Sequence, residues 1–147
     1  MYKTIPRNNP CYCINLRRAA NALTKCYDQA LAHLALTASQ FALLVELQAM
    51  GPCSKVELAN SARLDKSTIT RNIKTLKEKN LVADLSERGR RNSQLIVTPL
   101  GLDRINESMS HWRQMQAKVR EKLGPENIAA LYQIAASLDD WVYATEE

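Results

Sequence analysis

The fold is decided by the stretch Asp65-Lys-Ser-Thr-Ile-Thr-Arg-Asn-Ile-Lys-Thr-Leu-Lys-Glu-Lys79. Asp65 can begin a helix, because its carboxylate accepts the amide protons that the first turn leaves without partners. Apolar residues then recur at helical spacing and predict one narrow buried stripe of Ile69, Ile73 and Leu76. Hydroxyls, a carboxamide and cations cover the other faces, at Ser67, Thr68, Thr70, Arg71, Asn72, Lys74 and Lys77. Such side chains suit a helix that enters a DNA major groove, and an ordinary solvated helix face is the alternative.

A shorter helix is predicted immediately before this stretch. Ser54-Lys-Val-Glu57 is a capping box, in which the Ser and Glu side chains each bind a backbone amide of the other. The box predicts a helix over residues 55–61, joined by about four residues to the helix that Asp65 caps. Two short helices joined in this way form a helix-turn-helix. The turn lacks the Gly that is often found there.

A β-hairpin is predicted directly after the basic helix. Asn80 can end that helix in the left-handed conformation, and residues 81–86 and 94–98 have the composition of two strands. A hairpin after a helix-turn-helix makes a winged helix. Its tip carries three arginines, Arg88, Arg90 and Arg91. Arginine at a hairpin tip suits a narrow minor groove, where the potential is most negative, and a solvated loop is the alternative.

Helices are also predicted on the N-terminal side. Asn9 can act as a cap with Pro10 in the first helical position, so that a helix runs over residues 11–35. The capping box Thr37-Ala-Ser-Gln40 then opens a helix over residues 38–49. The predicted core residues of this second helix are Phe41, Leu44, Val45 and Leu47.

The C-terminal third is predicted to be helical as well. Thr98-Pro99 repeats the cap-then-Pro signal and starts a long helix that reaches about Lys122. Gly124-Pro125 breaks this helix, and a final helix is expected over residues 126–143.

Together these elements predict a mainly α fold with a small β-hairpin wing. The winged helix-turn-helix would occupy residues 37–98, and residues 1–36 and 99–147 would form a helical dimerisation region, all within one structural unit. A chain of 147 residues with two long helical ends can complete its core by dimerising.

The positive charge is concentrated in the predicted winged helix. The net charge is +5, and residues 54–98 hold ten Lys and Arg against five Asp and Glu, whereas the rest of the chain holds ten of each. This placement indicates a phosphate-binding surface. No apolar run approaches the length of about 18 residues that spans a bilayer, and no signal-peptide core is seen at the N-terminus, so we expect a cytoplasmic protein without a membrane partner.

The sequence favours neither a metal site nor an enzyme. The four cysteines Cys11, Cys13, Cys26 and Cys53 form no C-x-x-C pair, and no histidine lies at metal-ligand spacing from them. We therefore expect thiols, no metal and no cofactor. No local spacing places either of the two histidines beside a likely nucleophile or acid. The chain has four glycines, no G-x-S-x-G and no phosphate-cradling loop, so catalysis is not expected.

The resemblance to a known family rests on an ordered set of motifs. These are Asp65-Lys-Ser-Thr-Ile-Thr-Arg71, then Leu76 and Leu81-Val82, then Arg90-Arg91 and Leu95-Ile-Val-Thr-Pro-Leu-Gly101. With the order of helices around them, they resemble the multiple-antibiotic-resistance regulator (MarR) family across nearly the whole chain. The resemblance implies a homodimeric transcription regulator whose first and last helices interlock with those of its partner. Its reading helices would enter successive major grooves of a pseudo-palindromic operator, usually repressing until an effector arrives.

The predicted DNA contacts follow from position and from chemistry. Ser67, Thr68, Thr70 and Arg71 match the reading-helix positions of the family, and Arg91 matches its wing arginine. Lys55, Lys66, Lys74, Lys77 and Arg90 would neutralise phosphates, whereas Arg71 and Asn72 would reach base edges. Both Arg71→Ala and Arg91→Ala are expected to weaken operator binding. A winged helix used only for protein contacts is the alternative, but it would not need three arginines at its tip.

The wing departs from the family pattern. The family usually has an Asp two residues before its wing arginine, and this chain has Gly89 there. Either Glu87 substitutes as the partner of Arg91, or the wing tip is looser.

Two kinds of switch are open. In the family, a small aromatic or anionic effector often binds between the first, second and long helices. The side chains that we would expect there are Tyr12, Arg17, His33, His111 and Trp112. Core packing or solvent exposure is the alternative explanation for each of them. Alternatively, Cys11 and Cys13 lie in the first helical turn, where the helix dipole favours a thiolate, as in the thiol-sensing organic-hydroperoxide regulators. Cys53 could then be the resolving thiol of the partner subunit. The alternative to a redox role is that these cysteines are small apolar side chains packed in a helix interface.

Overall fold

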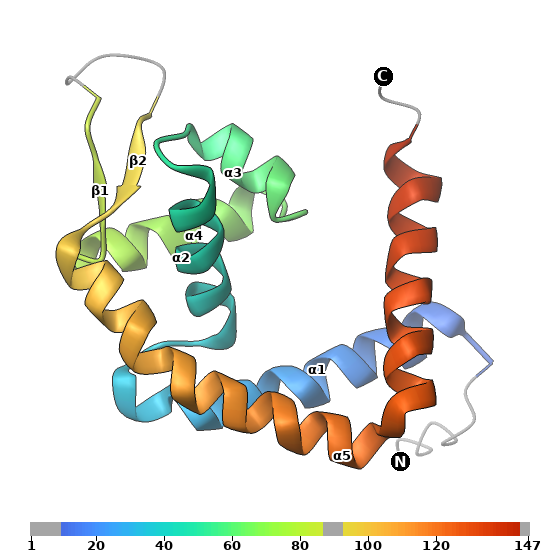
Figure 1. The fold of residues 1–147 in the computed structure, drawn as a ribbon. Coiled ribbons are helices and arrows are strands. Elements are labelled where there is room, and N and C mark those ends of the chain that lie inside the picture. The colour runs from blue at the N-terminus through green and yellow to red at the C-terminus, as the bar shows by residue number, and fades with distance from the viewer. Residues whose placement is uncertain (1–9, 87–92, 145–147) are drawn as a thin grey trace, which may run out of the picture. The chain divides into compact units, whose positions relative to one another are not determined.

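The computed structural model describes residues 10–86 and 93–144, and it divides into two compact units, one reaching Trp112 and the other beginning at Arg113. Figure 1 shows the order of the elements. Their bounds are α1 Tyr12–Leu31, the 3₁₀ helix η1 Ala32–Leu34, α2 Ala38–Met50, α3 Lys55–Ser61, α4 Lys66–Glu78, β1 Val82–Asp84, β2 Leu95–Val97 and α5 Pro99–Tyr143. The predicted fold class, mainly α with a β-hairpin wing, is confirmed.

The hairpin is short and is extended by a third segment. β1 and β2 pair antiparallel with Val82 opposite Val97, and Cys53 forms a further bridge to Leu95. Both strands are shorter than the sequence predicted. The amide of Leu81 donates instead to the carbonyl of Leu76 at the end of α4, and Thr98 is used to begin α5.

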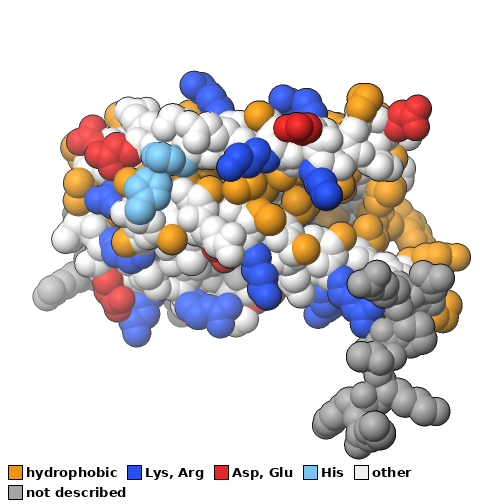
Figure 2. Space-filling model, turned by 90° about the horizontal axis from the view of Figure 1, so that it is seen from below, with side chains coloured by type: hydrophobic (Ala, Val, Ile, Leu, Met, Phe, Trp, Pro, Cys, Tyr) orange, Lys and Arg blue, Asp and Glu red, His pale blue; other side chains and the backbone are white. Residues whose placement is uncertain are grey.

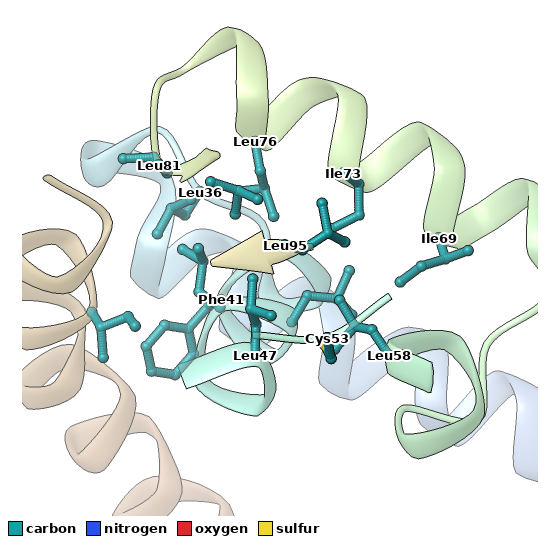
Figure 3. Close-up of a cluster of buried hydrophobic side chains, with 14 of the residues drawn as sticks. Leu36, Phe41, Leu47, Cys53, Leu58, Ile69, Ile73, Leu76, Leu81 and Leu95 are labelled. Carbon is teal, nitrogen blue, oxygen red and sulfur yellow. The ribbon is translucent and has the colours of Figure 1, made fainter. Parts of the chain in front are cut away.

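The core of the first unit lies between α2, α4 and the hairpin. Figure 3 shows Leu95 of β2 among side chains from both helices, including Ile73 and Leu76 of α4 and Leu47 of α2. The predicted stripe of α4 is therefore confirmed, with Ile69 1%, Ile73 2% and Leu76 0% exposed. Val45 was wrongly predicted as a core residue, because it is 36% exposed and faces a cavity described below.

The predicted helix caps are present. Thr37 and Ser54 each close a capping box, with Gln40 and Glu57 as their partners. The Thr98 hydroxyl accepts the amide of Gly101 at 3.0 Å and begins α5. These caps satisfy amides that the first turn of a helix cannot satisfy itself, and so they fix where each helix begins.

The first helix begins within one residue of its predicted start, but the residue at its cap differs from the prediction. Asn9 lies outside the described residues, and Cys11 is the residue that precedes α1, with extended backbone angles of −76° and 111°. The first turn closes on Cys11, because its carbonyl accepts both the amide of Asn15 at 3.2 Å and the side chain of Asn15 at 3.1 Å. The predicted 11–35 helix also ends as a 3₁₀ turn, after which Ala35 is left-handed with φ 55°.

The turn of the helix-turn-helix, which lacks the glycine often found there, has an arginine in the left-handed conformation. Arg63 has φ 52°, and its amide donates to the carbonyl of Asn60 at 3.3 Å. A left-handed residue other than Gly costs about 1–2 kcal/mol, so the turn is formed at some expense of stability. The predicted left-handed end of α4 at Asn80 is confirmed by φ 59°.

The second unit consists of the C-terminal part of α5. The predicted break is confirmed at Gly124, where φ is 78° and ψ is 162°. Beyond the break, large apolar side chains are exposed, at Leu131, Tyr132, Ile134, Leu138, Trp141 and Val142.

Among the described residues, no single helix is both long enough and apolar enough to cross a membrane. The consecutive segments Tyr12–Leu34 and Ala38–Met50 meet the length and composition requirement only as a pair, and they are bent by 78°.

Candidate nucleic-acid interface and cavity

The exposed face of α4 is hydrophilic and cationic. Burial of its apolar stripe turns the opposite side of the helix to solvent. Lys66, Ser67, Thr70, Arg71 and Lys74 are exposed there. A cation in the middle of a helix with hydroxyls around it is the arrangement that reads guanine edges and binds phosphates in a major groove.

The start of α4 is held by a single carboxylate. Asp65 accepts the amide of Thr68 at 2.8 Å, the hydroxyl of Ser67 at 2.6 Å and the hydroxyl of Thr68 at 2.7 Å. The hydrogen bonds from Ser67 and then from Thr68 lower the pKa of Asp65 well below its ordinary value. Because the folded pKa is the lower one, the cap stabilises the fold above the ordinary pKa of Asp and is lost as the pH falls below it. In this arrangement Ser67 and Thr68 offer DNA their oxygen lone pairs, since both hydroxyl protons are in use.

Two residues that were predicted to contact DNA are bonded to other residues of the protein. The side-chain Nδ2 of Asn72 donates a hydrogen bond to the Ser39 hydroxyl of α2 at 3.2 Å. The ammonium group of Lys77 lies 3.5 Å from the carboxylate of Asp84 in β1. Contact of Asn72 with a base edge would require its bond to α2 to break, whereas Lys77 remains 38% exposed and close to the surface.

Asp84 organises the base of the wing. One oxygen of its carboxylate accepts the amide of Ser86 at 3.0 Å, the hydroxyl of Ser86 at 2.7 Å and the amide of Gln94 at 2.9 Å. Partial burial acts to raise the pKa of Asp84, but the bonds from Ser86 and Gln94 and the charge of Lys77 outweigh it, so the pKa is well below the ordinary value. The carboxylate thus joins the two sides of the hairpin next to the last pair of the two strands, Asp84 opposite Leu95.

Replacing Asp84 with alanine is expected to loosen the wing base without unfolding the protein. The amides of Ser86 and Gln94 would lose their acceptor, so their hydrogen exchange should accelerate about tenfold or more, since each lost bond contributes about 1.5–3 kcal/mol. The measurement is amide hydrogen exchange followed by mass spectrometry or NMR. Lys77→Ala is the matched control, because it removes only the 3.5 Å ion pair. Equal exchange in both variants would contradict the role given to Asp84.

The wing base is also tied to the start of α3. The amide of Lys55 donates to the hydroxyl of Ser93 at 2.9 Å, next to the bridge between Cys53 and Leu95. The predicted phosphate contact at Lys55 therefore lies beside the hairpin. The predicted tip residues Arg88, Arg90 and Arg91, together with Glu87 and Gly89, lie outside the described residues.

A cavity of about 340 Å³ lies between α1, α2 and the start of α5. Its walls are almost entirely apolar and include two aromatic rings, Phe41 and Trp112, whose centroids are 6.4 Å apart. The lining is Tyr27, Leu31, Ala38, Phe41, Ala42, Val45 and Trp112. A cavity of this size and lining suits a small aromatic molecule, and none of its lining residues carries a positive charge for an anion.

The predicted effector residues are only partly brought together. Trp112 lines the cavity. His33 and His111 contact each other, with their Nε2 atoms 3.1 Å apart, but neither belongs to the cavity lining. Tyr12 is 86% exposed on α1, and neither it nor the exposed Arg17 belongs to the cavity lining.

The cysteines are in different environments. Cys11 and Cys13 are exposed at the start of α1, whereas Cys53 is 4% exposed in the core. Burial, and then the charge of Glu57, raises the pKa of the Cys53 thiol. Both effects disfavour the thiolate, so they weigh against Cys53 as a resolving thiol.

Several residues were not predicted as part of either site. Tyr27, Phe41 and Val45 belong to helical stripes that were assigned to the core, and an apolar stripe does not distinguish a core from an apolar cavity. Asp84 could have been singled out as a carboxylate within a strand that is otherwise mostly apolar.

The helix-turn-helix with its exposed basic α4, followed by a hairpin, defines the class of winged-helix DNA-binding proteins. Residues 36–87 match the family model described as "MarR family". The matched residues cover the helix-turn-helix and the first strand of the wing, and over them the resemblance to the MarR family found in the sequence is confirmed. The coarse functional prediction, a DNA-binding transcriptional regulator, is confirmed with it.

Solved structures of transcriptional regulators have the same fold. The M. tuberculosis transcriptional regulator MosR in complex with DNA is 29% identical, with a TM-score of 0.71, over 87% of this chain and 98% of that chain. Bordetella bronchiseptica BpsR, whose DNA binding is regulated by 6-hydroxynicotinic acid, is 26% identical, with a TM-score of 0.79, over 95% and 98%. The organohalide-sensing regulator RdhR bound to 2,4-dichlorophenol shares the fold at 13% identity, with a TM-score of 0.78, over 88% and 78%. No curated protein matches the chain.

Proposed function

We propose that the chain is a homodimeric repressor that binds a pseudo-palindromic operator and is released by a small aromatic effector. The observation that carries the DNA-binding part is the exposed face of α4, with Thr70, Arg71 and Lys74 beside one another on a helix fixed by its own cap. Arg71 and Thr70 would read bases, and Lys66 and Lys74 would bind phosphates. The arginines of the wing tip, Arg88, Arg90 and Arg91, would enter the adjacent minor groove.

Dimerisation is supported by apolar side chains that face solvent in the single chain. Tyr12, Ile14 and Leu16 of α1 are 86%, 37% and 41% exposed, and Trp141 of α5 is 79% exposed. Exposed apolar area of this extent on the terminal helices is typical of a surface that a second subunit covers. A dimer would place two reading helices about 34 Å apart, which corresponds to half-sites one helical turn apart.

The effector is proposed to occupy the cavity lined by Phe41 and Trp112. Its apolar walls favour an uncharged aromatic compound over the anionic one that the family resemblance also allowed. The α2 residues Ala38 and Ala42 line the cavity, and the next residue along from Ala38, Ser39, is bonded to Asn72 of α4. A ligand that displaces α2 would therefore act directly on the reading helix.

Filling the cavity tests this proposal. Ala42→Phe places a ring in the space that the effector would occupy, so the variant should keep its DNA affinity but respond at least tenfold less to ligand. The probes are 2,4-dichlorophenol and 6-hydroxynicotinic acid, measured by release of labelled DNA, with the uncharged phenol expected to act at the lower concentration. Met50→Phe, at an exposed position of α2 that does not line the cavity, is the control. An unchanged response of Ala42→Phe would contradict the assigned site.

A thiol switch is the second candidate, because Cys11 and Cys13 are both exposed and lie two residues apart at the start of α1. Under this proposal, mild peroxide abolishes DNA binding and dithiothreitol restores it. The double variant Cys11→Ser/Cys13→Ser should be insensitive to peroxide. Equal sensitivity of the double variant would remove this candidate.

A further inference from the structure

The two histidines of the chain meet in the fold although 78 residues separate them in the sequence. His33 lies in η1 and His111 in α5, both within the first unit. Their Nε2 atoms are 3.1 Å apart, and their rings are nearly perpendicular, with an interplanar angle of 76° and centroids 4.2 Å apart. Figure 2 shows the two histidines, in pale blue, side by side on the surface of the molecule.

We propose that this pair is a binding site for a divalent transition-metal ion, with Cu²⁺ preferred. A histidine nitrogen lies about 2.0–2.1 Å from a bound metal ion. Two nitrogens 3.1 Å apart can both reach one ion at that distance with an N–metal–N angle of about 100°, between the square-planar and tetrahedral values. The separation of the two nitrogens therefore fits chelation, and rotation of the imidazole side chains would turn both nitrogens toward one ion.

The two elements that carry the histidines are held together independently of the pair. The guanidinium group of Arg104 in α5 donates to the carbonyl of Leu34, the residue after His33, at 2.6 Å. Leu31, two residues before His33, is fully buried. The imidazoles are thus brought together by neighbouring contacts, and a preorganised pair of ligands loses less freedom when it binds an ion.

The composition of the site determines which ions it takes. Among the residues that the structure describes, no group of three or more His, Cys, Asp or Glu side chains could hold a metal ion, so water would complete the coordination. Two imidazoles without a carboxylate favour Cu²⁺ and Ni²⁺ and give little affinity for Mg²⁺ or Ca²⁺, which prefer oxygen ligands. A bound ion would connect η1 to α5 beside the cavity, since Trp112 follows His111 and lines it.

Metal titration of the full chain tests the proposal. The starting protein is the Cys11→Ser/Cys13→Ser variant, which removes the exposed thiols as competing ligands. We expect one Ni²⁺ or one Cu²⁺ per chain by calorimetry, Cu²⁺ binding more tightly than Ni²⁺, and no binding of Mg²⁺. Either His33→Ala or His111→Ala should reduce the affinity at least tenfold, because a single imidazole remains. Circular dichroism checks that both variants are folded.

A second measurement needs no histidine variant. Because the chain contains only two histidines, its NMR spectrum holds two imidazole spin systems, and substoichiometric Cu²⁺ should broaden both together. Cu²⁺ should also quench the fluorescence of Trp112, observed alone in a Trp141→Phe background. Metal binding that survives both histidine variants, or imidazole signals that Cu²⁺ leaves sharp, would overturn the proposal and leave the pair as an ordinary hydrogen bond.

Discussion

Replacing Arg71 with alanine is expected to lower the affinity for the specific operator by about 5- to 150-fold, the range of one bidentate contact to a base pair, which is about 1–3 kcal/mol. Arg71 is exposed in the middle of α4 and lies between the capped start of the helix and Lys74. Affinity for unrelated DNA should change much less, because that binding depends on phosphate contacts.

Lys74→Ala is the matched control for this experiment. Lys74 is exposed on the same helix, but a lysine in contact with phosphate carries no sequence information. Its loss should weaken specific and non-specific binding equally and reduce the slope of log affinity against log salt by about 1. Binding by fluorescence anisotropy at several salt concentrations separates the two variants. If Arg71→Ala also lowers the affinity for specific and for unrelated DNA equally, Arg71 contacts phosphate and does not read bases.

Replacing Gly101 with alanine is expected to destabilise the first unit by about 1–3 kcal/mol, the usual cost of forcing an atom into a packed site. A Cβ atom at this position would lie 2.2 Å from the carbonyl oxygen of Leu81 and 2.8 Å from the Cγ1 atom of Val97. The first obstacle is backbone, and the Leu81 carbonyl also accepts the amide of Thr98 at 3.0 Å, so it has little freedom to move.

The sign of this effect makes the experiment decisive. Replacing an exposed glycine in a helix with alanine normally raises the free energy of unfolding by about 0.5–1 kcal/mol, because alanine is the better helix former. A lower midpoint of urea unfolding for Gly101→Ala would therefore report the close approach of α5 to Leu81 and Val97. Asp103→Ala, exposed on the same helix, should change stability by less than about 0.5 kcal/mol. A stabilised Gly101→Ala variant would contradict the packing described for α5.

Local signals in the sequence were sufficient for the elements of the winged helix. Asp65, Ser54 and Thr37 each begin a helix as predicted, because a cap acts within its own first turn. The stripe of α4 was likewise visible, since helical periodicity alone determines which side chains share a face. The start of α1 was predicted to within one residue, but its cap is Cys11, because the first turn closes on the Cys11 carbonyl.

The contacts between elements could not be predicted from the sequence. Asn72 has the composition of a reading residue, but its bond to Ser39 joins positions 33 residues apart. The histidine pair joins η1 to α5 over a still longer separation, and no periodic pattern relates its members. The cavity shows the same limit, because Val45 belongs to the apolar pattern of α2 whether that pattern faces a core or an empty space.

Selection of bound sequences from a random pool of double-stranded DNA tests whether α4 reads DNA. We expect one enriched motif, a near-palindrome whose half-sites are centred about 10 base pairs apart, bound with an affinity that falls steeply as salt rises. The Arg71→Ala variant should lose the enrichment at one position of each half-site. An unenriched pool, or affinity that does not depend on salt, would contradict the assignment of α4 as a DNA-reading helix.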